Sequence, residues 1–209
     1  MLEDMDVKLE YRDNGDKLQE YIRGCLQEYH MTQSICALDF AVQMHRGQKR
    51  KEGIPYIVHP MTMACHALSL GIREDDLLAV ILLHDVCEDC PVEPEELPVN
   101  ENIKKGVVCM TFERREGETK EDALERYYKR MRESREACLT KLFDRCHNVS
   151  SMAKAFSGSK INSYIMETRK YIYPLFDCVK ERYPEWTEIV FVLEYHMKSV
   201  IGAFQIQKE

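Results

Sequence analysis

The chain has 209 residues, of which 44% are hydrophobic and 31% charged, so it is long enough to bury a substantial core and has the composition of an ordinary soluble protein. Its formal net charge is −7, which leaves no overall positive field to attract nucleic acid, and an anionic substrate would need local lysines and arginines. We find no apolar secretory signal and no apolar run long enough to span a bilayer. The nine cysteines are therefore expected to be free thiols in a reducing cytoplasm.

Residues 1–30 are polar and charged apart from an amphipathic pattern at Leu18–Cys25, so we expect an N-terminal extension that carries one helix. Residues 31–205 then show one helical pattern after another, without sustained strand alternation. We therefore predict a single all-α domain, a bundle of helices, over this range.

The helices of this domain are delimited by breakers. One is expected to end near Gly47, where a loop rich in glycine, proline and basic residues begins. The next starts at His59, because Pro60 suits the first turn of a helix. A third is expected to run without interruption from Glu74 to Asp89. Further helices are expected at 94–98, 100–110, 119–132, 134–155, 160–182 and 185–203.

The end of the third predicted helix carries four ionisable residues, His84, Asp85, Glu88 and Asp89. At about 100° per residue they share one face of a helix whose preceding turns are almost wholly apolar. Charges in such a setting are costly unless they are paired or bind a metal, so the pattern favours a metal site over a solvated surface. Imidazole and carboxylate together suit Mn, Fe, Zn or Mg, and further ligands are needed.

Two candidates for these further ligands, His59 and Asp144, stand in separate segments. An isolated histidine at a helix start is more often a cap or a packing residue, and a lone aspartate in a helix is usually exposed. Neither is convincing without the other. His147 points about 60° away from Asp144 on their helix, which makes it a poor candidate for another ligand.

In chain order, His59, His84-Asp85 and Asp144 form a set H…HD…D that resembles the HD-domain phosphohydrolase superfamily. The match is closest to the hydrolase domain of RelA/SpoT-type alarmone enzymes and covers about residues 31–180. It is carried by RKEGIPYIVHP at 50–60, LLHDVCED at 82–89, KLFDRCHN at 141–148 and the weaker ETRKYIYPL at 167–175.

The resemblance implies an HD-domain helical bundle that uses Mn²⁺ to remove the 3′-pyrophosphate of guanosine tetra- or pentaphosphate, giving GDP or GTP. The metal ligands it implies are His59, His84, Asp85 and Asp144. Glu88 and Asp89 match the acidic pair that handles water and protons, and we expect their close approach in an apolar setting to shift their protonation. A stand-alone hydrolase is expected.

Substrate contacts are implied by the same resemblance at Arg50, Lys51, Asn148 and Ser151. Lys141 lies on one helical face with Asp144, so it could pair with Asp144 or with a substrate phosphate. Glu52 departs from the small polar residue common in the alarmone enzymes, and an acid there could repel phosphate.

Three functions stay open at this point. A guanosine 3′,5′-bispyrophosphate (ppGpp) 3′-pyrophosphohydrolase is favoured by Glu88-Asp89 and Arg50-Lys51. An HD phosphohydrolase acting on another nucleotide or phosphate ester is favoured modestly by Glu52 and by a divergent middle segment. The third, a non-catalytic nucleotide sensor, is disfavoured by the intact ligand set. No nucleic-acid or membrane partner is expected, and the last helix is typical of a core element or a homodimer face.

Overall fold

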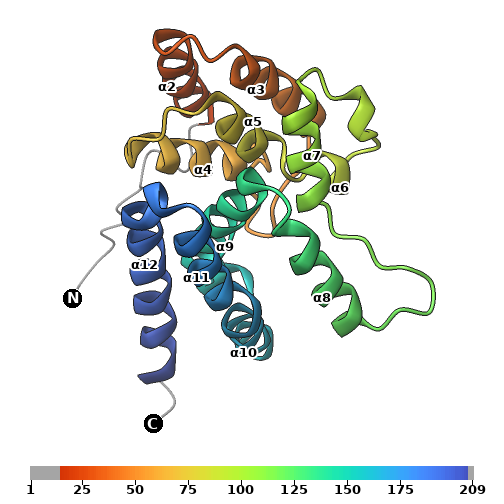
Figure 1. Ribbon diagram of the computed structural model, residues 1–209, viewed down its shortest axis with the longest axis vertical. Coiled ribbons are helices and arrows are strands. Elements are labelled where there is room, and N and C mark those ends of the chain that lie inside the picture. The colour runs from red at the N-terminus through yellow and green to blue at the C-terminus, as the bar shows by residue number, and fades with distance from the viewer. Residues whose placement is uncertain (1–14, 207–209) are drawn as a thin grey trace.

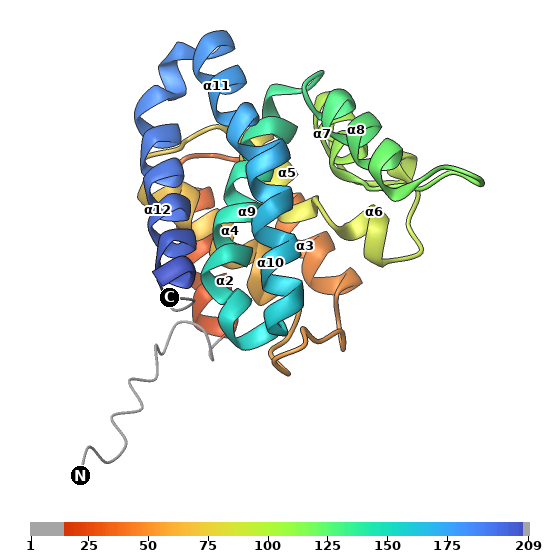
Figure 2. The ribbon, with the colours of Figure 1, turned by 90° about the horizontal axis from the view of Figure 1, so that it is seen from below.

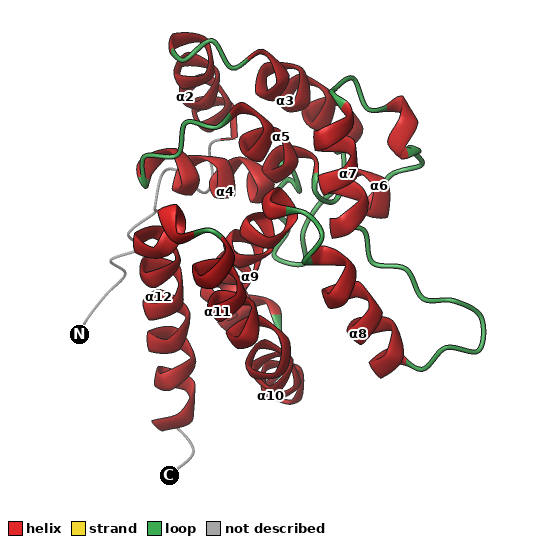
Figure 3. Cartoon of the chain, in the orientation of Figure 1, coloured by secondary structure: helices red, strands yellow, loops and turns green. Residues whose placement is uncertain are grey.

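The computed structural model describes residues 15–206. Within that range it is built of helices and connecting loops (Figure 3), and it contains one isolated antiparallel bridge, between Lys49 and Pro55. The predicted all-α fold class is therefore confirmed. The first 14 residues of the expected N-terminal extension lie outside the described residues.

The α-helices described are α2 (Gly15–Glu28), α3 (Thr32–Met44), α4 (Val58–Ser69), α5 (Asp75–Leu83), α6 (Val86–Asp89), α7 (Glu101–Met110), α8 (Lys120–Met131), α9 (Arg135–Ala155), α10 (Gly158–Glu167), α11 (Tyr173–Arg182) and α12 (Thr187–Ile206). Two short 3-10 helices, η1 (Pro94–Glu96) and η3 (Pro184–Trp186), and one π-helix, η2 (Thr168–Ile172), connect them. Thr119 caps α8 as predicted, because its hydroxyl accepts the Asp122 N–H at 3.1 Å.

The centre of the bundle is α5, whose residues from Leu77 to Leu83 are fully buried. It packs against α3, α4, α7 and α9, which explains why its sequence is apolar on every side. Gly106 allows α7 to approach closely, since a Cβ atom there would meet Val80 Cγ2 at 2.7 Å. The N-terminal α2 joins the same core by packing on α3 and α4.

Helix α9 connects two parts of the bundle. It packs on α4, α5 and α7 and also on α11 and α12. In two views, α7 and α8 lie on the opposite side of α9 from α12 (Figure 1; Figure 2). No helix of the described residues is long and apolar enough to cross a membrane. All nine cysteines are free thiols, as predicted.

One predicted helix is broken. We expected an uninterrupted helix from Glu74 to Asp89, but α5 ends at Leu83 and α6 begins at Val86. The Nδ1 atom of His84 lies 2.9 Å from the Ile81 carbonyl oxygen. A side-chain hydrogen bond therefore replaces a backbone hydrogen bond of the helix at this point. Glu88 and Asp89 consequently lie on the separate turn α6 and are exposed, which corrects the apolar setting that we predicted for them.

The predicted helix 160–182 is also divided, into α10, the π-helix η2 and α11. Pro174 has no N–H with which to continue the helical ladder. The Thr168 hydroxyl donates to the Tyr164 carbonyl at 2.8 Å and accepts from Arg145 at 3.1 Å. These bonds fix the wider turn beside the face of α9 that carries Arg145.

Candidate metal centre and substrate cleft

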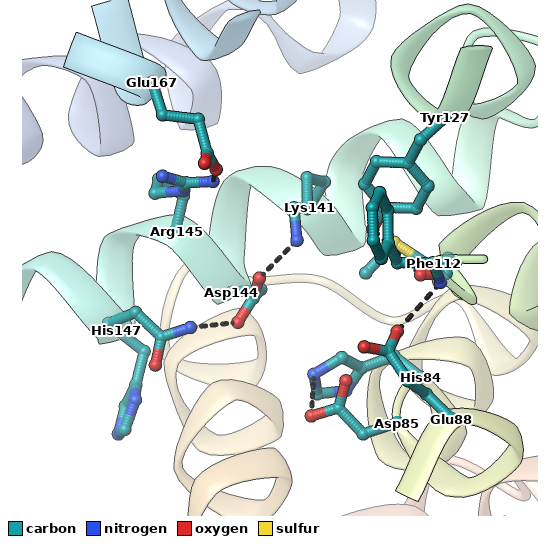
Figure 4. Close-up of polar contacts among 12 residues, drawn as sticks. His84, Asp85, Glu88, Phe112, Tyr127, Lys141, Asp144, Arg145, His147 and Glu167 are labelled. Carbon is teal, nitrogen blue, oxygen red and sulfur yellow. Dashed lines mark hydrogen bonds and ion pairs between the residues drawn. The ribbon is translucent and has the colours of Figure 1, made fainter. Parts of the chain in front are cut away.

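The break after α5 turns His84 and Asp85 toward the same point. A carbonyl oxygen can only accept a hydrogen bond, so the Nδ1–H group of His84 donates to the Ile81 carbonyl. The other ring nitrogen, Nε2, is then the one that can bind a metal ion. His84 Nε2 lies 2.9 Å from Asp85 Oδ2 (Figure 4). The His84 ring is only 1% exposed, and this nitrogen lacks a well-directed hydrogen bond.

His59 and Asp144 reach the same point from two other helices. His59 lies in the first turn of α4, and Asp144 lies in the middle of α9. His59 Nε2 is 3.3 Å from Asp144 Oδ1 and 3.8 Å from Asp85 Oδ2. One ligand atom from each of His59, His84 and Asp144 lies within 4.8 Å of the others.

This donor set fits a divalent metal ion. Two imidazole nitrogens and two carboxylates converge in a buried place, where charges are costly unless they are paired or coordinated. The second nitrogen of each ring is held by a protein group, which is the usual arrangement for histidine ligands. Nitrogen and oxygen donors without thiolate favour Mn, Fe, Zn or Mg over softer ions.

The pKa values of these groups follow from burial and from their mutual contacts. Burial lowers the pKa of His59. For His84 burial acts in the same direction, but the Asp85 carboxylate outweighs it and raises the pKa to about 9. Burial opposes ionisation of Asp144, yet Lys141 and His59 hold the pKa of that carboxyl well below its usual range.

Metal affinity should therefore depend on pH. In the metal-free protein the pKa of His84 is raised from 6.5 to about 9, so its ring holds a proton below pH 9 that must leave before Nε2 can bind a metal. His59, whose pKa is lowered, is already neutral in this range. We expect the apparent affinity to rise by about tenfold per pH unit up to about pH 9. Chelator competition at several pH values measures this, and a constant affinity from neutral pH to pH 8.5 would contradict it.

Two aromatic residues contact the candidate ligands, and sequence reasoning gave neither a role. Tyr56 donates its hydroxyl to Asp85 Oδ2 at 2.5 Å. His147 Nδ1 lies 2.9 Å from His59 Nδ1, and one of the two nitrogens must donate. Tyr56 was visible in the string PYIVHP, but its contact with Asp85 depends on the break after α5.

Around Asp144, the predicted helical face is confirmed. Lys141 Nζ lies 2.8 Å from Asp144 Oδ2, and the Asn148 amide donates to Asp144 Oδ1 at 2.5 Å (Figure 4). Of the two roles that we considered for Lys141, the structure shows the ion pair with Asp144. Arg50 donates to Asn148 Oδ1 at 2.8 Å, which connects the basic loop to α9.

The acidic pair lies beside this centre. Glu88 Oε2 accepts the backbone N–H of Phe112 at 2.8 Å, so the loop after α7 orients its carboxylate (Figure 4). The Glu88 side chain is exposed as a whole, but the protein around its carboxyl group displaces water and raises its pKa, and the nearby Asp85 carboxylate adds to this effect. Glu88 is thus suited to hold or release a proton nearer to neutral pH than an ordinary glutamate.

The candidate metal centre, the acidic pair and the basic loop open onto a cleft of about 540 Å³. This size suits a nucleotide. Nine of the eleven predicted site residues line it: Arg50, Lys51, His59, Asp85, Glu88, Asp89, Lys141, Asp144 and Asn148. His84 is buried and is not among the lining residues. Ser151 is not among the lining residues, and its hydroxyl donates to the carbonyls of His147 and Asn148 at 3.3 Å. Glu52 lines the cleft and lies 3.8 Å from Arg50 Nε.

Arg145 holds the walls of this cleft together, a role that the sequence did not suggest. Its guanidinium is 2% exposed and donates to Tyr128 on α8 at 2.9 Å and to Glu167 on α10 at 2.6 Å. It also stacks 4.0 Å from the centroid of the Tyr164 ring. One side chain of α9 therefore connects the helices on either side of the cleft.

We expect Arg145→Met to lower the free energy of unfolding by about 3–5 kcal/mol, because it leaves the Glu167 carboxylate and the Tyr128 hydroxyl without their partner. Urea denaturation measures the change. Arg182→Met, which alters an exposed arginine of α11, is the control and should change stability by less than about 0.5 kcal/mol. Equal losses in the two variants would contradict this role of Arg145.

Cys87 and Cys90 stand on either side of the acidic pair in a Cys-x-x-Cys spacing that our sequence analysis overlooked. Burial raises the pKa of both thiols, to about 11 for Cys87. The sulfur of Cys90 lies 3.4 Å from Gln48 Nε2 and 3.7 Å from His45 Nδ1, so Cys90 serves as a packing residue between α6 and the end of α3.

The chain is similar to proteins of one known family. A model of the HD domain family matches residues 37–175. The guanosine-3′,5′-bis(diphosphate) 3′-pyrophosphohydrolase of Aquifex aeolicus is 32% identical over 167 residues, which cover 76% of this chain and 23% of that protein. The probable enzyme of the same name from Synechocystis is 27% identical over 179 residues, with the same two coverages of 76% and 23%. The chain thus spans about a quarter of the length of these curated relatives.

A solved structure described as a metazoan ortholog of SpoT that hydrolyzes ppGpp has the same fold. The two chains superpose with a TM-score of 0.64 at 20% identity, and the match covers 82% of this chain and 94% of the other. The resemblance to RelA/SpoT-type hydrolase domains that we drew from motifs is thereby confirmed. Because the family model matches well over half of its residues, this chain belongs to the HD-domain family.

Proposed function

We propose that this protein hydrolyses the 3′-pyrophosphate of guanosine 3′,5′-bis(diphosphate), giving GDP and pyrophosphate, with Mn²⁺ as its metal. The observation that carries the proposal is the convergence of His59, His84, Asp85 and Asp144 on one cleft that also holds an acidic pair and a basic loop. The printed names of the Aquifex aeolicus and Synechocystis relatives support this substrate.

Each residue of the centre has a stated task in this proposal. His59, His84, Asp85 and Asp144 would hold the ion, which when bound lowers the pKa of water and neutralises phosphate charge. Tyr56 and His147 keep Asp85 and His59 in place through their hydrogen bonds. Lys141 keeps the Asp144 carboxylate ionised and oriented.

The acidic pair would handle the protons. Glu88 has a raised pKa and a carboxylate fixed by the Phe112 N–H, so it can take a proton from an attacking water molecule or deliver one to the leaving group. Asp89, exposed on the same turn, lines the cleft and can relay that proton to solvent.

The basic loop would bind the nucleotide. Arg50 is already oriented by Asn148 and can stack on a base or contact phosphate, while Lys51 presents an exposed ammonium. Glu52 is close enough to Arg50 to be partly neutralised by it, which weakens our earlier objection that this acid repels phosphate. Ser151 would have to rotate its hydroxyl away from the helix backbone to reach a ligand.

Product analysis tests the proposal. Metal-loaded protein is incubated with guanosine 3′,5′-bis(diphosphate), and the nucleotide products are separated by chromatography. We expect GDP and pyrophosphate in equal amounts. Orthophosphate as the released group, or turnover only of nucleoside monophosphates, would overturn the substrate assignment and favour another HD phosphohydrolase. Tight nucleotide binding by metal-loaded protein without any product would instead favour a sensor.

The proposal also includes the cellular compartment and the oligomeric state. Nine free cysteines agree with a reducing compartment such as the cytoplasm. We expected α12 to be either a core element or a homodimer face. Val190 and Leu193 are buried in the core, whereas Phe191, Val192 and Tyr195 are exposed apolar side chains that a homodimer could cover. Sedimentation of the wild type beside Phe191→Glu would show a dimer that the substitution dissociates, and a monomeric wild type would contradict the dimer.

A further inference from the structure

Three lysines from separate parts of the chain converge on the exposed side of the cleft. Lys51 belongs to the basic loop, Lys120 begins α8, and Lys160 lies in α10. Lys51 and Lys120 line the cleft, as does the Phe156 ring. The ammonium groups of Lys51 and Lys160 both stand over that ring, 5.9 Å and 4.1 Å from its centroid.

Within residues 15–206, these three ammonium groups are not neutralised by a carboxylate. Among the residues that the structure describes, none of the three has a carboxylate within ion-pair distance. The exposed Lys170 and Lys198, by contrast, pair with Glu121 and Glu194. A chain with a net charge of −7 thus leaves cations unpaired at the place where its cleft opens.

The three lysines are also close enough to affect one another. Lys51 contacts Lys160 and lowers the pKa of its ammonium group, and Lys120 adds to this effect from across the cleft. Like charges at short range repel, so this arrangement opposes its own stability in the absence of an anion. An anion placed among the three would remove the repulsion and accept hydrogen bonds from each.

We propose that Lys51, Lys120 and Lys160 form a second anion site, which binds a phosphate or diphosphate group at the end of the substrate opposite the bond that is cleaved. The inference rests on the proposed function. The metal centre is buried, and the lysines are exposed, so a ligand that fills the cleft presents one end to each.

The test compares two ligands that differ only at that second end, guanosine 3′,5′-bis(diphosphate) and guanosine 3′-diphosphate. Binding to metal-loaded protein is measured by calorimetry in a Glu88→Gln background, which holds the ligand without turnover. We compare Lys120→Ala, Lys160→Ala, the charge-conserving Lys160→Arg and the control Lys129→Ala, which removes an exposed lysine of α8 that does not line the cleft.

We expect each alanine variant to raise the Kd of the bis(diphosphate) by about tenfold, as for the loss of one charge-assisted hydrogen bond. The Kd of the 3′-diphosphate should change much less. Lys160→Arg should retain binding, Lys129→Ala should match the parent, and the difference between the two ligands should shrink at high salt. Equal weakening of both ligands, or no weakening, would overturn the second anion site.

The design separates this inference from the proposed function. If the parent protein binds neither guanosine ligand, the proposed substrate is wrong. If it binds both ligands equally and the lysine variants have no effect, the substrate class stands and the lysine site is wrong.

Discussion

Asp144→Asn is expected to abolish metal binding and to lower the rate of hydrolysis by roughly 1,000-fold or more, since a catalytic metal contributes several kcal/mol to the stabilisation of the transition state. The Asp144 carboxylate contacts His59, Lys141 and Asn148 at once. Asparagine has nearly the size of aspartate and keeps one oxygen acceptor. It lacks the negative charge that neutralises the metal ion and the Lys141 ammonium group.

Elemental analysis of the purified variant measures metal content directly, and circular dichroism checks that the helices remain. The matched control is Asp39→Asn, which removes an exposed carboxylate of α3 that pairs with Arg23. The control should retain full metal content and activity. A folded Asp144→Asn protein that keeps stoichiometric metal would show that Asp144 is not a ligand.

Glu88→Gln should retain the metal yet lose activity by about 100- to 10,000-fold, the range for removal of a general acid or base. Glutamine can still accept the Phe112 N–H through its amide oxygen, so the loop after α7 should stay in place. The raised pKa of Glu88 predicts that the acidic limb of the wild-type pH profile lies above the ordinary glutamate value of 4.5.

At saturating metal, that acidic limb should disappear in the residual activity of Glu88→Gln, because the titrating carboxyl group of Glu88 has been removed. Glu93→Gln, which alters an exposed residue just beyond α6, is the control and should behave as the wild type. Unchanged activity in Glu88→Gln would remove Glu88 from the chemistry and leave Asp89 as the proton carrier to be tested.

Only part of the candidate ligand set is visible in the residues themselves. His84 and Asp85 are adjacent at the end of an apolar helix, whereas His59 and Asp144 were included because the ordered motifs resemble HD-domain phosphohydrolases. Asp144 shares a helical face with Lys141 and Asn148, and the structure confirms that face. The fold class followed from apolar periodicity, and the helix starts predicted at residues 119 and 134 coincide with the caps that the structure shows at Thr119 and Ser134.

What sequence reasoning missed depends on contacts between distant segments. At the break after Leu83, the His84 ring donates a hydrogen bond to the Ile81 carbonyl oxygen. This side-chain bond competes with the backbone hydrogen bonds of the helix, and the apolar period of 3.6 residues cannot reveal it. His147 was judged only by its angle to Asp144, whereas its partner is His59 on another helix. Arg145 lies in the helical pattern of α9 like any charged residue, and only the packed bundle surrounds it with Tyr128 and Glu167.

The most direct test of the central claim is pyrophosphate release from guanosine 3′,5′-bis(diphosphate) with and without Mn²⁺, in the wild type and in Asp85→Ala. We expect pyrophosphate release that requires Mn²⁺ in the wild type and is absent in the variant. Asp85 Oδ2 lies 2.9 Å from His84 Nε2 within the proposed ligand set. Release that proceeds without metal, or that survives in metal-loaded Asp85→Ala, would contradict this expectation.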